Sequence, residues 1–312
     1  MELPFRRVTK EDRDLVRKYT LPGNASNCDL AFSNICSWSF LYETELAVVD
    51  GFLLFRFKGD HQGRRRTMYM YPLGHGDIRS VIDKMERDSL SHQGEPLMML
   101  GVLNENKNDL ERCFPGGFLF FSDRNYFDYV YLRTELAALK GKKHQTHRNH
   151  INRFKALYSY EYVPLTPDLV PECLMLESKW VDRQKPDKNS YGLSAEQRSM
   201  HYALQNMDDL DIIGGVIKID GRVAAFSFGS PVTENTFVTH VEKGDISFDG
   251  IYSIMNQEMA AHLPEQYIYI NREEDLGLEG LRHAKLSYHP EFLLEKWAAV
   301  KKPHSTFMSE IK

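Results

Sequence analysis

Residues 237–261 read FVTHVEKGDISFDGIYSIMNQEMAA and combine an apolar strand, a glycine-containing loop and a helix. His240 and Glu242 lie two residues apart near the end of the strand, so one strand face carries an imidazole and a carboxylate. Gly244 and Gly250 permit sharp turns, and the helix that follows directs its unpaired N–H groups and positive dipole end toward Glu242. The stretch predicts a site for an anionic or carbonyl ligand. An ordinary strand–loop–helix connection with a solvated Glu242 fits the same pattern.

The composition is that of a globular protein of about two domains. The 312 residues are 42% hydrophobic and 12% aromatic, which supports a sizeable core and excludes a disordered chain. The net charge of -5 gives no overall signature of nucleic-acid or membrane binding, so any basic site must be local. The N-terminal stretch MELPFRRVTKEDRDLVRKY is charged, and no run reaches the roughly 18 apolar residues of a membrane helix. We therefore expect a cytoplasmic protein without a transmembrane segment.

Neither the cysteines nor the clustered histidines predict a metal site. The cysteines lie far apart and form no CxxC pair, so we expect reduced thiols. They are Cys28, Cys36, Cys113 and Cys173. His144, His147 and His150 are spaced by three residues, which drifts around a helix, and they have no carboxylate or cysteine among them. We expect no metal.

The predicted elements occur twice in the same order. The first series has helices over 9–19 and 29–41, strands over 46–49, 52–58 and 68–72, a helix over 77–91, a strand over 97–102, a helix over 106–113 and strands over 118–121 and 123–131. The second has helices over 166–182 and 194–207, strands over 211–219, 223–229 and 236–242, a helix from 251, a strand over 267–271, a helix over 273–285 and a strand over 293–300. Each series begins with two helices and a three-stranded meander, followed by helix, strand, helix and strand, and the strand over 123–131 is a further strand at the end of the first series.

A basic segment separates the two series. Residues 134–158 predict one long helix with Gly141 as a weak point, and the part from Lys140 to Lys155 contains no acidic residue. Its apolar face leaves several polar residues for solvent or for an anion. These residues are Lys142, Lys143, Arg148, Asn149, Asn152 and Arg153. The segment is either a solvated basic face or a binding site for a polyphosphate such as a tRNA acceptor end.

A second group of polar residues follows the strand over 267–271. Its members are Asn271, Asp275, Arg282, Lys285 and Tyr288. Arg282 and Lys285 are three residues apart on a predicted helix and could clamp a carboxylate or a phosphate. The same residues could equally form an internal salt-bridge network with Asp275.

The order of elements is that of the GCN5-related N-acetyltransferase (GNAT) fold, and here it occurs twice. Several phrases resemble a bacterial family grouped with the C-terminal domain of phosphatidylglycerol lysyltransferase. They are SNICSW near Asn34, DRNYFDYVY at Asp123, LKGKKHQTHRNHINRF at Leu139, HVEKGDISFDGIY at His240 and NREEDLGLEGLRHAKLSYHP at Asn271. The resemblance covers nearly the whole chain. It implies an α+β fold of two tandem GNAT-like domains, each a mixed, mostly antiparallel sheet flanked by helices, over residues 1–133 and 134–312, the second including the basic linking helix 134–158.

The resemblance also implies a reaction, the transfer of an aminoacyl group from aminoacyl-tRNA to an amine or hydroxyl. The acceptor would be a small molecule, a peptide or a lipid headgroup. An acyl-CoA donor is disfavoured because Asp245 and Asp249, between the two glycines of the loop, would repel phosphates. Two alternatives stay open: an acyl-CoA-dependent N-acyltransferase acting on a small amine, and a non-catalytic ligand-binding module.

Acyl transfer requires a proton acceptor, donors for the developing oxyanion and groups that position the substrate. We expect Glu242 to be the base and His240 to be its substitute. Tyr252 and Asn256 are four residues apart on the helix after the loop and could orient the acceptor. A one-residue slip of strand register would turn Glu242 away from the site.

Overall fold

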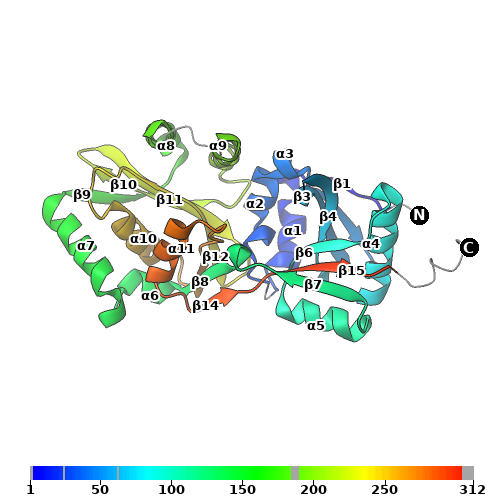
Figure 1. Cartoon of the computed structure of the whole chain (residues 1–312). Helices are drawn as coiled ribbons and strands as arrows, with labels where there is room; N and C mark the ends of the chain where they lie inside the picture. Colours follow the sequence, from blue (N-terminus) through cyan, green and yellow to red (C-terminus); the bar gives the residue numbers. More distant parts are fainter. Residues whose placement is uncertain (1–2, 24, 62, 184–189, 304–312) are drawn as a thin grey trace, which may run out of the picture. The chain divides into compact units, whose positions relative to one another are not determined.

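The computed structural model describes residues 3–23, 25–61, 63–183 and 190–303 and confirms the predicted α+β architecture of two mixed sheets flanked by helices (Figure 1). The chain forms two compact units. The first comprises Met1–Tyr19, Trp38–Phe127 and Leu294–Lys312, and the second comprises Thr20–Ser37 and Asp128–Leu293. The sequence predicts a domain boundary between residues 133 and 134. The boundaries of the two compact units lie at other positions.

The first unit contains an eight-stranded sheet. The strands are β1 (Arg6–Arg7), β2 (Glu45–Val49), β3 (Phe52–His61), β4 (Arg64–Met70), β5 (Leu73–Gly74), β6 (Met98–Val102), β7 (Phe118–Ser122) and β15 (Trp297–Lys301). Their order is β1-β2-β3-β4-β6-β15-β7, and β5 pairs with β3. Strands β4 and β6 are parallel, whereas the β1–β2, β2–β3, β3–β4, β3–β5, β6–β15 and β15–β7 pairs are antiparallel.

The helices of the first unit are η1 (Lys10–Asp12), α1 (Arg13–Thr20), α3 (Ser39–Tyr42), α4 (Ile78–Gln93), α5 (Asn104–Cys113) and η3 (Arg124–Tyr126). Asp77 caps α4, because its side chain accepts hydrogen bonds from the backbone N–H groups of Arg79 and Ser80. The apolar face of α4 packs into the core against β3, β4 and β6. The sheet and α4 therefore form two layers that share one hydrophobic core.

The second unit contains a seven-stranded sheet. Its strands are β8 (Asp128–Leu132), β9 (Tyr160–Pro164), β10 (Ile213–Ile219), β11 (Arg222–Pro231), β12 (Thr236–Gly244), β13 (Tyr269–Asn271) and β14 (Phe292–Leu294). Their order is β14-β8-β13-β12-β11-β10-β9. The β12–β13 pair is parallel, whereas β12–β11, β11–β10, β10–β9 and β13–β8 are antiparallel.

Helices cover both faces of this second sheet. They are η2 (Cys28–Leu30), α2 (Phe32–Ser37), α6 (Arg133–Ala138), η4 (Lys142–His144), α7 (Gln145–Leu157), η5 (Pro167–Leu169), α8 (Val170–Arg183), α9 (Ser190–Gln205), α10 (Ile251–His262) and α11 (Glu279–Ser287). Helices α8 and α10 both contact β11 and β12, and Figure 1 shows them on opposite faces. Apolar residues of α10 and α7 form a buried cluster with residues of β8, β10 and β13.

The last strand of each series lies in the sheet of the other series. Strand β8 precedes the basic segment in sequence but pairs with β13 of the second sheet. Strand β15 comes from the end of the chain but lies between β6 and β7 of the first sheet. Because the exchange is reciprocal, both sheets have the same order, namely a three-stranded meander followed by a parallel partner, the exchanged strand and an edge strand.

The predicted continuous helix over 134–158 is wrong, because the structure divides it into α6, η4 and α7. Leu139 and Gly141 have φ angles of 46° and 86°, and this left-handed backbone ends a helix. The guanidinium of Arg148 donates to the backbone oxygens of both residues and to Gln145 Oε1. A side chain that the sequence assigned to solvent or an anion therefore stabilises the break.

Candidate functional site

The two parallel strands of the second sheet part after a short paired stretch. Strand β12 pairs with β13 only where Thr236, Phe237 and Val238 lie beside 269–271. Strand β12 then continues to Gly244, while β13 ends. Beyond the point where two parallel strands part, no backbone hydrogen bonds join them, and side chains can face the space between them. Ligands often bind at such places in open sheets.

A β-bulge sets the direction of His240 on β12. On β11, Phe228 lies opposite Val241 and Gly229 lies opposite Thr239, so His240 has no opposing residue in the register. The bulge requires glycine on β11, because a Cβ on Gly229 would lie 1.8 Å from a backbone oxygen of β12. The simple alternation predicted for this strand is therefore interrupted at the residue of interest.

His240 is held at both ring nitrogens. Its Nδ1 lies 2.8 Å from Glu273 Oε1, and its Nε2 lies 2.7 Å from Ser33 Oγ and 2.9 Å from Ser230 Oγ. The two hydroxyls also lie 2.6 Å from each other. Since a carboxylate only accepts hydrogen bonds, the Nδ1–H points to Glu273 and Nε2 is left to accept from a seryl hydroxyl. Histidine, carboxylate and hydroxyls form one hydrogen-bonded chain, in which both serines are 1% exposed and the Glu273 side chain is 24% exposed.

Glu273 is ionised in this arrangement. Burial raises the pKa of its carboxyl group, but the hydrogen bonds from His240 Nδ1 and from Asn34 Nδ2, at 2.9 Å, outweigh burial and hold the pKa below its ordinary value. The residue has a φ of 57°, so the chain leaves β13 in a turn and not in the helix predicted from residue 273. This turn brings the carboxylate to His240.

A second pair of charged side chains, Glu242 and Arg272, comes from the same two strands. Arg272 Nη2 lies 3.4 Å and 3.5 Å from the two carboxylate oxygens of Glu242, and both side chains are 14% exposed. The guanidinium also lies over the rings of Tyr288 and Tyr131, at 5.1 Å and 5.9 Å. Burial opposes its charge, but Glu242 raises the pKa of Arg272 overall. Within the described chain, the buried Arg272 Nη1 has no hydrogen-bond partner.

Side chains from α11 fix the loop that carries Arg272 and Glu273. Lys285 Nζ donates to the backbone oxygens of Arg272 and Glu274. Asp275 accepts two hydrogen bonds of 2.8 Å from Arg282, one from Tyr129 and one from a backbone N–H. Arg282 contributes most to lowering the pKa of Asp275. Asp275 and Arg282 thus form the internal network that the sequence left open as an alternative to a substrate clamp.

Asn271 has a similar structural contact set. Its Nδ2 donates to the backbone oxygen of Ser26 and to Asp128 Oδ2, both at 2.7 Å, and its Oδ1 accepts from the backbone N–H of Glu273. Asp128 also accepts from the backbone N–H of Cys28. Asn271 is fully buried and holds the beginning of the loop.

The remaining predicted residues of this region lie on or beside α10. Tyr252 donates to the backbone oxygen of Gly244 at 3.4 Å. Asn256 is 5% exposed, and its Oδ1 has no hydrogen-bond partner in the described residues. Tyr288 stacks on His147 with ring centroids 3.8 Å apart, and burial raises the pKa of its hydroxyl.

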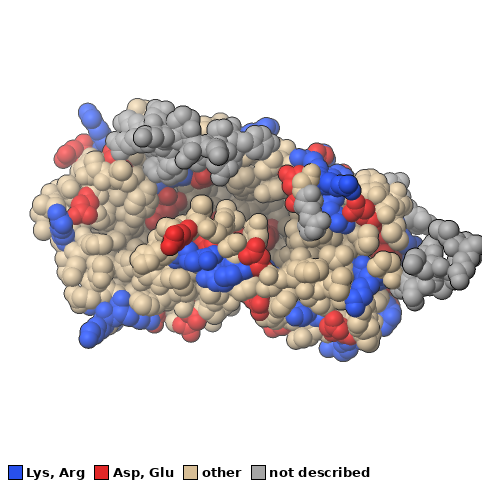
Figure 2. Space-filling model, viewed as in Figure 1, with Lys and Arg blue, Asp and Glu red and all other residues tan. Residues whose placement is uncertain are grey.

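The basic segment is exposed, but acids from other elements neutralise part of its charge. Lys143 pairs with Glu135 at 2.7 Å and Arg153 pairs with Asp249 at 3.0 Å. Asn149 accepts from Gln145, while Lys142 and Asn152 are exposed. Figure 2 shows Lys and Arg in several small groups with acidic side chains among them. A Cβ on Gly250 would lie 2.8 Å from the backbone oxygen of His150, so this glycine lets α7 pack closely on the start of α10.

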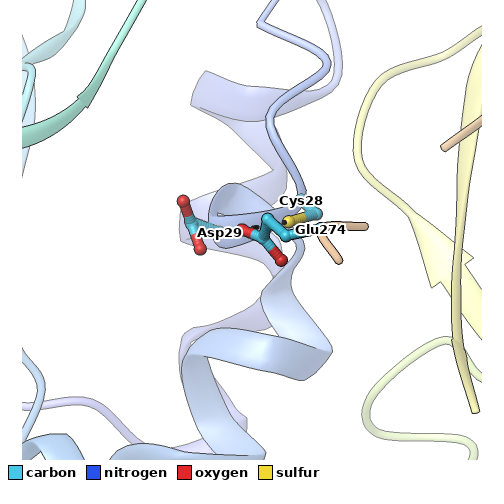
Figure 3. Close-up of side chains that lie close together, drawn as sticks. All are labelled: Cys28, Asp29 and Glu274. Atoms are coloured by element: carbon cyan, nitrogen blue, oxygen red, sulfur yellow. Dashed lines mark hydrogen bonds between the residues drawn. The ribbon is translucent and has the colours of Figure 1, made fainter. Parts of the chain in front are cut away.

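One group of side chains in the second unit has the chemistry of metal ligands. Ligand atoms of Cys28, Asp29 and Glu274 lie within 4.8 Å of one another (Figure 3). The set combines one cysteine sulfur with two carboxylates. The Cys28 thiol already donates to Asp128 and Glu274, at 3.4 Å and 3.5 Å, so hydrogen bonds account for its placement.

Sequence reasoning singled out His240 and Glu242 but missed four residues that contact them. Arg272 and Glu273 could have been predicted, because they directly follow Asn271 in the charged sequence NREED. Ser33 and Ser230 come from α2 and β11 and carry no local signal. Only the folded chain brings these elements to His240.

Two sheets with one strand order, each with a parallel pair beside the exchanged strand, define a tandem GNAT-like protein. The chain belongs to the family of the C-terminal domain of phosphatidylglycerol lysyltransferase, whose sequence pattern matches residues 22–300. Among the helices of the described residues, none is both long and apolar enough to cross a membrane.

Several solved structures are similar to this chain. A conserved protein of unknown function from Bacteroides thetaiotaomicron VPI-5482 is 48% identical, with a TM-score of 0.91 over 96% of this chain and 100% of that chain. The C-terminal domain of a proposed lysylphosphatidylglycerol synthetase from Agrobacterium fabrum is 13% identical, with a TM-score of 0.63 over 96% and 94% of the two chains. L-PGS from Bacillus licheniformis is 16% identical, with a TM-score of 0.63 over 98% and 95%. No curated protein matches.

Proposed function

We propose that the chain is an acyltransferase that moves an aminoacyl group from aminoacyl-tRNA to an amine or hydroxyl acceptor. The observation that carries this proposal is the His240–Glu273 pair, 2.8 Å apart, at the point where β12 and β13 part. Family membership supports the reaction class, because the related proteins named above include lysylphosphatidylglycerol synthetases. The acceptor is a small molecule, a peptide or a lipid headgroup.

The proposed proton acceptor is His240, and its hydrogen bonds to Glu273, Ser33 and Ser230 support this role. The acceptor nitrogen or oxygen bonds to the ester carbonyl carbon and loses its proton, and the bond from that carbon to the tRNA ribose oxygen then breaks. The proton reaches Nε2 through the hydroxyl of Ser33 or Ser230, both within 2.9 Å, and returns to the ribose oxygen. Ionised Glu273 stabilises the imidazolium that forms. Glu242, the base expected from the sequence, is left to bind substrate.

The basic segment is the proposed contact for tRNA. Lys142 and Lys155 are exposed, and Arg153 is largely exposed in its pair with Asp249. Replacing all three with alanine should weaken tRNA binding and flatten its salt dependence, because each phosphate contact adds to the slope. Arg148 is left unchanged since it holds the break between α6 and α7. Unchanged affinity and salt slope would contradict this contact.

The matched control for that experiment replaces three exposed basic residues of the first unit, Lys18, Arg64 and Arg87. The two triple variants remove the same net charge. A role of the basic segment predicts that only the first variant loses affinity, whereas equal losses would indicate a general effect of charge.

The reaction itself is tested with tRNA charged with labelled amino acids. Wild-type protein should move label from tRNA to one of three acceptor types, namely phospholipid, peptide or small amine, and His240→Gln should lower kcat by about 100-fold or more. His92→Gln, at an exposed site in α4, is the control. Parallel reactions with acyl-CoA test the other donor. Full activity of His240→Gln would remove His240 from the reaction.

The burial of Ser33 and Ser230 favours a second candidate, a non-catalytic binding module. Both hydroxyls are 1% exposed, and together with Glu273 they satisfy the imidazole of His240. In that case the network only holds β12, α2 and the loop after β13 together. Ligand binding without transfer of label to any acceptor, by wild-type protein, would establish this candidate.

A further inference from the structure

Strand β7 forms one end of the first sheet. It pairs with β15 on one side, and no strand of the described residues lies on its other side. Proteins usually protect such edges with charged residues, proline or short strands, because an open edge can pair with another chain. The other sheet ends follow this rule, since β1 consists of two arginines, β9 contains Glu161 and Pro164, and β14 has three residues. The residues of β7, FLFFS, include no charge and no proline, so its edge is open to a further strand.

The backbone groups on the open edge belong to alternate residues of β7. The N–H of Lys302 donates to the backbone oxygen of Gly117 at 2.8 Å, and these two residues extend the register of β15 and β7. In an antiparallel ladder only every second residue is hydrogen-bonded to a given neighbour, so the odd-numbered residues of β7 face β15. The residues between them direct their N–H and C=O groups outward, and they are Phe118, Phe120 and Ser122.

Two large apolar side chains lie exposed beside this edge. Leu119 is 47% exposed and Phe121 is 58% exposed. They share one face of the strand, because Phe118 and Phe120 point to the opposite face and pack in the core of the first unit. The residues of β15 opposite the exposed pair are also apolar and only partly buried. The edge therefore combines open backbone groups with exposed apolar side chains.

A second copy of β7 matches this edge in antiparallel orientation. When Phe120 lies opposite the same residue of the copy, the outward groups of Phe118 meet those of Ser122, and about six backbone hydrogen bonds form. Leu119 then lies opposite Phe121 of the copy, and the same contact occurs again on the other side of the two-fold axis. These are the positions without backbone hydrogen bonds, where opposing side chains come closest and pack best.

The ends of the edge have complementary charges. Asp123 is exposed and extended in backbone, so it continues the face of Leu119 and Phe121. Lys302 is exposed at the other end, opposite Gly117. In the two-fold arrangement Asp123 lies opposite Gly117 of the copy, which has no side chain to separate the carboxylate from Lys302 of the copy. Both ends gain this attraction at once, which favours a second copy over an unrelated strand.

We propose that β7 pairs with β7 of a second copy of this chain, so that two first sheets join into one continuous sheet. The pairing uses the first unit alone and is independent of the transfer reaction proposed for the second unit. Because a strand of this length buries less than the roughly 1,200 Å² of a standard interface, we expect a reversible dimer with a dissociation constant on the order of 10 μM.

Sedimentation velocity of the full chain over about 1–200 μM brackets this dissociation constant. The average mass should rise from that of one chain towards that of two. Leu119→Lys should weaken association by about 30-fold or more, because a charge on the edge opposes strand pairing. The matched control is Leu90→Lys, since Leu90 is 45% exposed in α4 of the same unit and should leave association unchanged. The Tm of each variant checks that it folds.

The charges at the ends of the edge are tested with Lys302→Glu. It should weaken association about fivefold, because each new glutamate then faces the Asp123 carboxylate of the other copy. Lys18→Glu makes the same charge change at an exposed site in α1 and is the control.

A disulfide cross-link tests the register directly and does not depend on a disruptive variant. In a Cys113→Ser background, which leaves the buried cysteines in place, Leu119→Cys is mixed with Phe121→Cys under mild oxidation. Opposing residues at such positions lie within the distance that a disulfide spans, so the mixture should cross-link far more than either variant alone.

Three results would overturn the pairing. The first is a chain that stays monomeric over the whole concentration range, and the second is association of Leu119→Lys as strong as that of Leu90→Lys. The third is cross-linking in the mixture no greater than in the separate variants, which would place any dimer on another surface. Loss of aminoacyl transfer with association intact would refute the proposed function and leave the dimer standing.

Discussion

Asp275→Asn is the substitution that tests most directly how the loop after β13 is held. The carboxylate is fully buried and accepts two hydrogen bonds from Arg282, one from Tyr129 and one from the backbone N–H of Gly277. Asparagine keeps the shape but removes the charge, so Arg282 loses its partner. Because this loop also carries Arg272, the variant should loosen the candidate site together with the fold.

The expected loss is about 2 kcal/mol of unfolding free energy. Removing one partner of a buried ion pair costs about 3–5 kcal/mol. We expect a smaller loss of unfolding free energy here because the Arg282 side chain is 34% exposed, so water can solvate its charge. For a chain of 312 residues, a loss of about 2 kcal/mol corresponds to a fall in Tm of about 3 °C. Urea unfolding and a thermal scan at pH 7 measure both quantities.

The pH dependence checks the cause. Arg282 lowers the pKa of Asp275 in the folded chain, so the native state binds a proton less readily than the unfolded state. The carboxylate therefore stabilises the fold fully above its unfolded pKa, near 3.8, and this contribution is lost as the pH falls below that value. The difference between wild type and Asp275→Asn should be constant from pH 8 to pH 5 and shrink below about pH 4.

Asp14→Asn is the control for this experiment, because Asp14 forms an exposed pair with Arg13 and should cost less than about 0.5 kcal/mol. Arg282→Met combined with Asp275→Asn completes a double-mutant cycle, in which the double variant should be more stable than the sum of the single losses predicts. Strict additivity, or a loss from Asp275→Asn as small as that of Asp14→Asn, would refute the reasoning.

Three further changes test other parts of the fold. Gly229→Ala should cost about 3 kcal/mol because its Cβ would lie 1.8 Å from a backbone oxygen, whereas Gly280→Ala, in open space on α11, should stabilise by about 0.5 kcal/mol; urea unfolding measures both. Burial lowers the pKa of His144 and His147, so stability should fall by up to about 1.4 kcal/mol per histidine for each pH unit below 6.5, with a smaller slope in His147→Gln. Lys301→Met should lower Tm and reduce the free energy of unfolding by about 2 kcal/mol, because removal of the buried cation leaves two carboxylates of α4 unpaired.

Each of these results has a clear contrary outcome. Equal effects of the two glycine changes would show that the bulge tolerates a side chain. A stability that rises on acidification between pH 6.5 and pH 5 in wild type, and not in His147→Gln, would reverse the sign argued for the histidines. A neutral Lys301→Met would show that its ion pairs do not hold β15.

The parts of the fold that the sequence predicted well depend on local chemistry. The Asp50–Gly51 and Asp220–Gly221 turns lie between strands that the sequence predicts, and all four residues have the positive φ angles that tight hairpin turns require. Asp77 likewise lies at the start of the predicted helix and caps it. In each case the residues that decide the structure are neighbours in the chain.

The parts that the sequence missed depend on distant residues. Leu139 adopts a left-handed backbone that few leucines adopt, and the partner that stabilises it, Arg148, lies in the next helix. The alternating pattern of β8 describes a strand but does not say which sheet it joins. At the site, the strand pattern identified His240, whereas its contacts with Ser33, Ser230 and Glu273 arise from three other elements.

The exchange of β8 and β15 also determines the order in which the chain can complete its folding during synthesis. The first sheet leaves a place between β6 and β7 that residues 297–301 fill, and these residues leave the ribosome after every other strand of the two sheets. The second sheet, by contrast, takes up β8 early and needs no strand beyond β14. The first sheet is therefore completed after the second although most of its strands are made earlier, and until then β6 and β7 present unpaired edges on which a chaperone or another nascent chain can act.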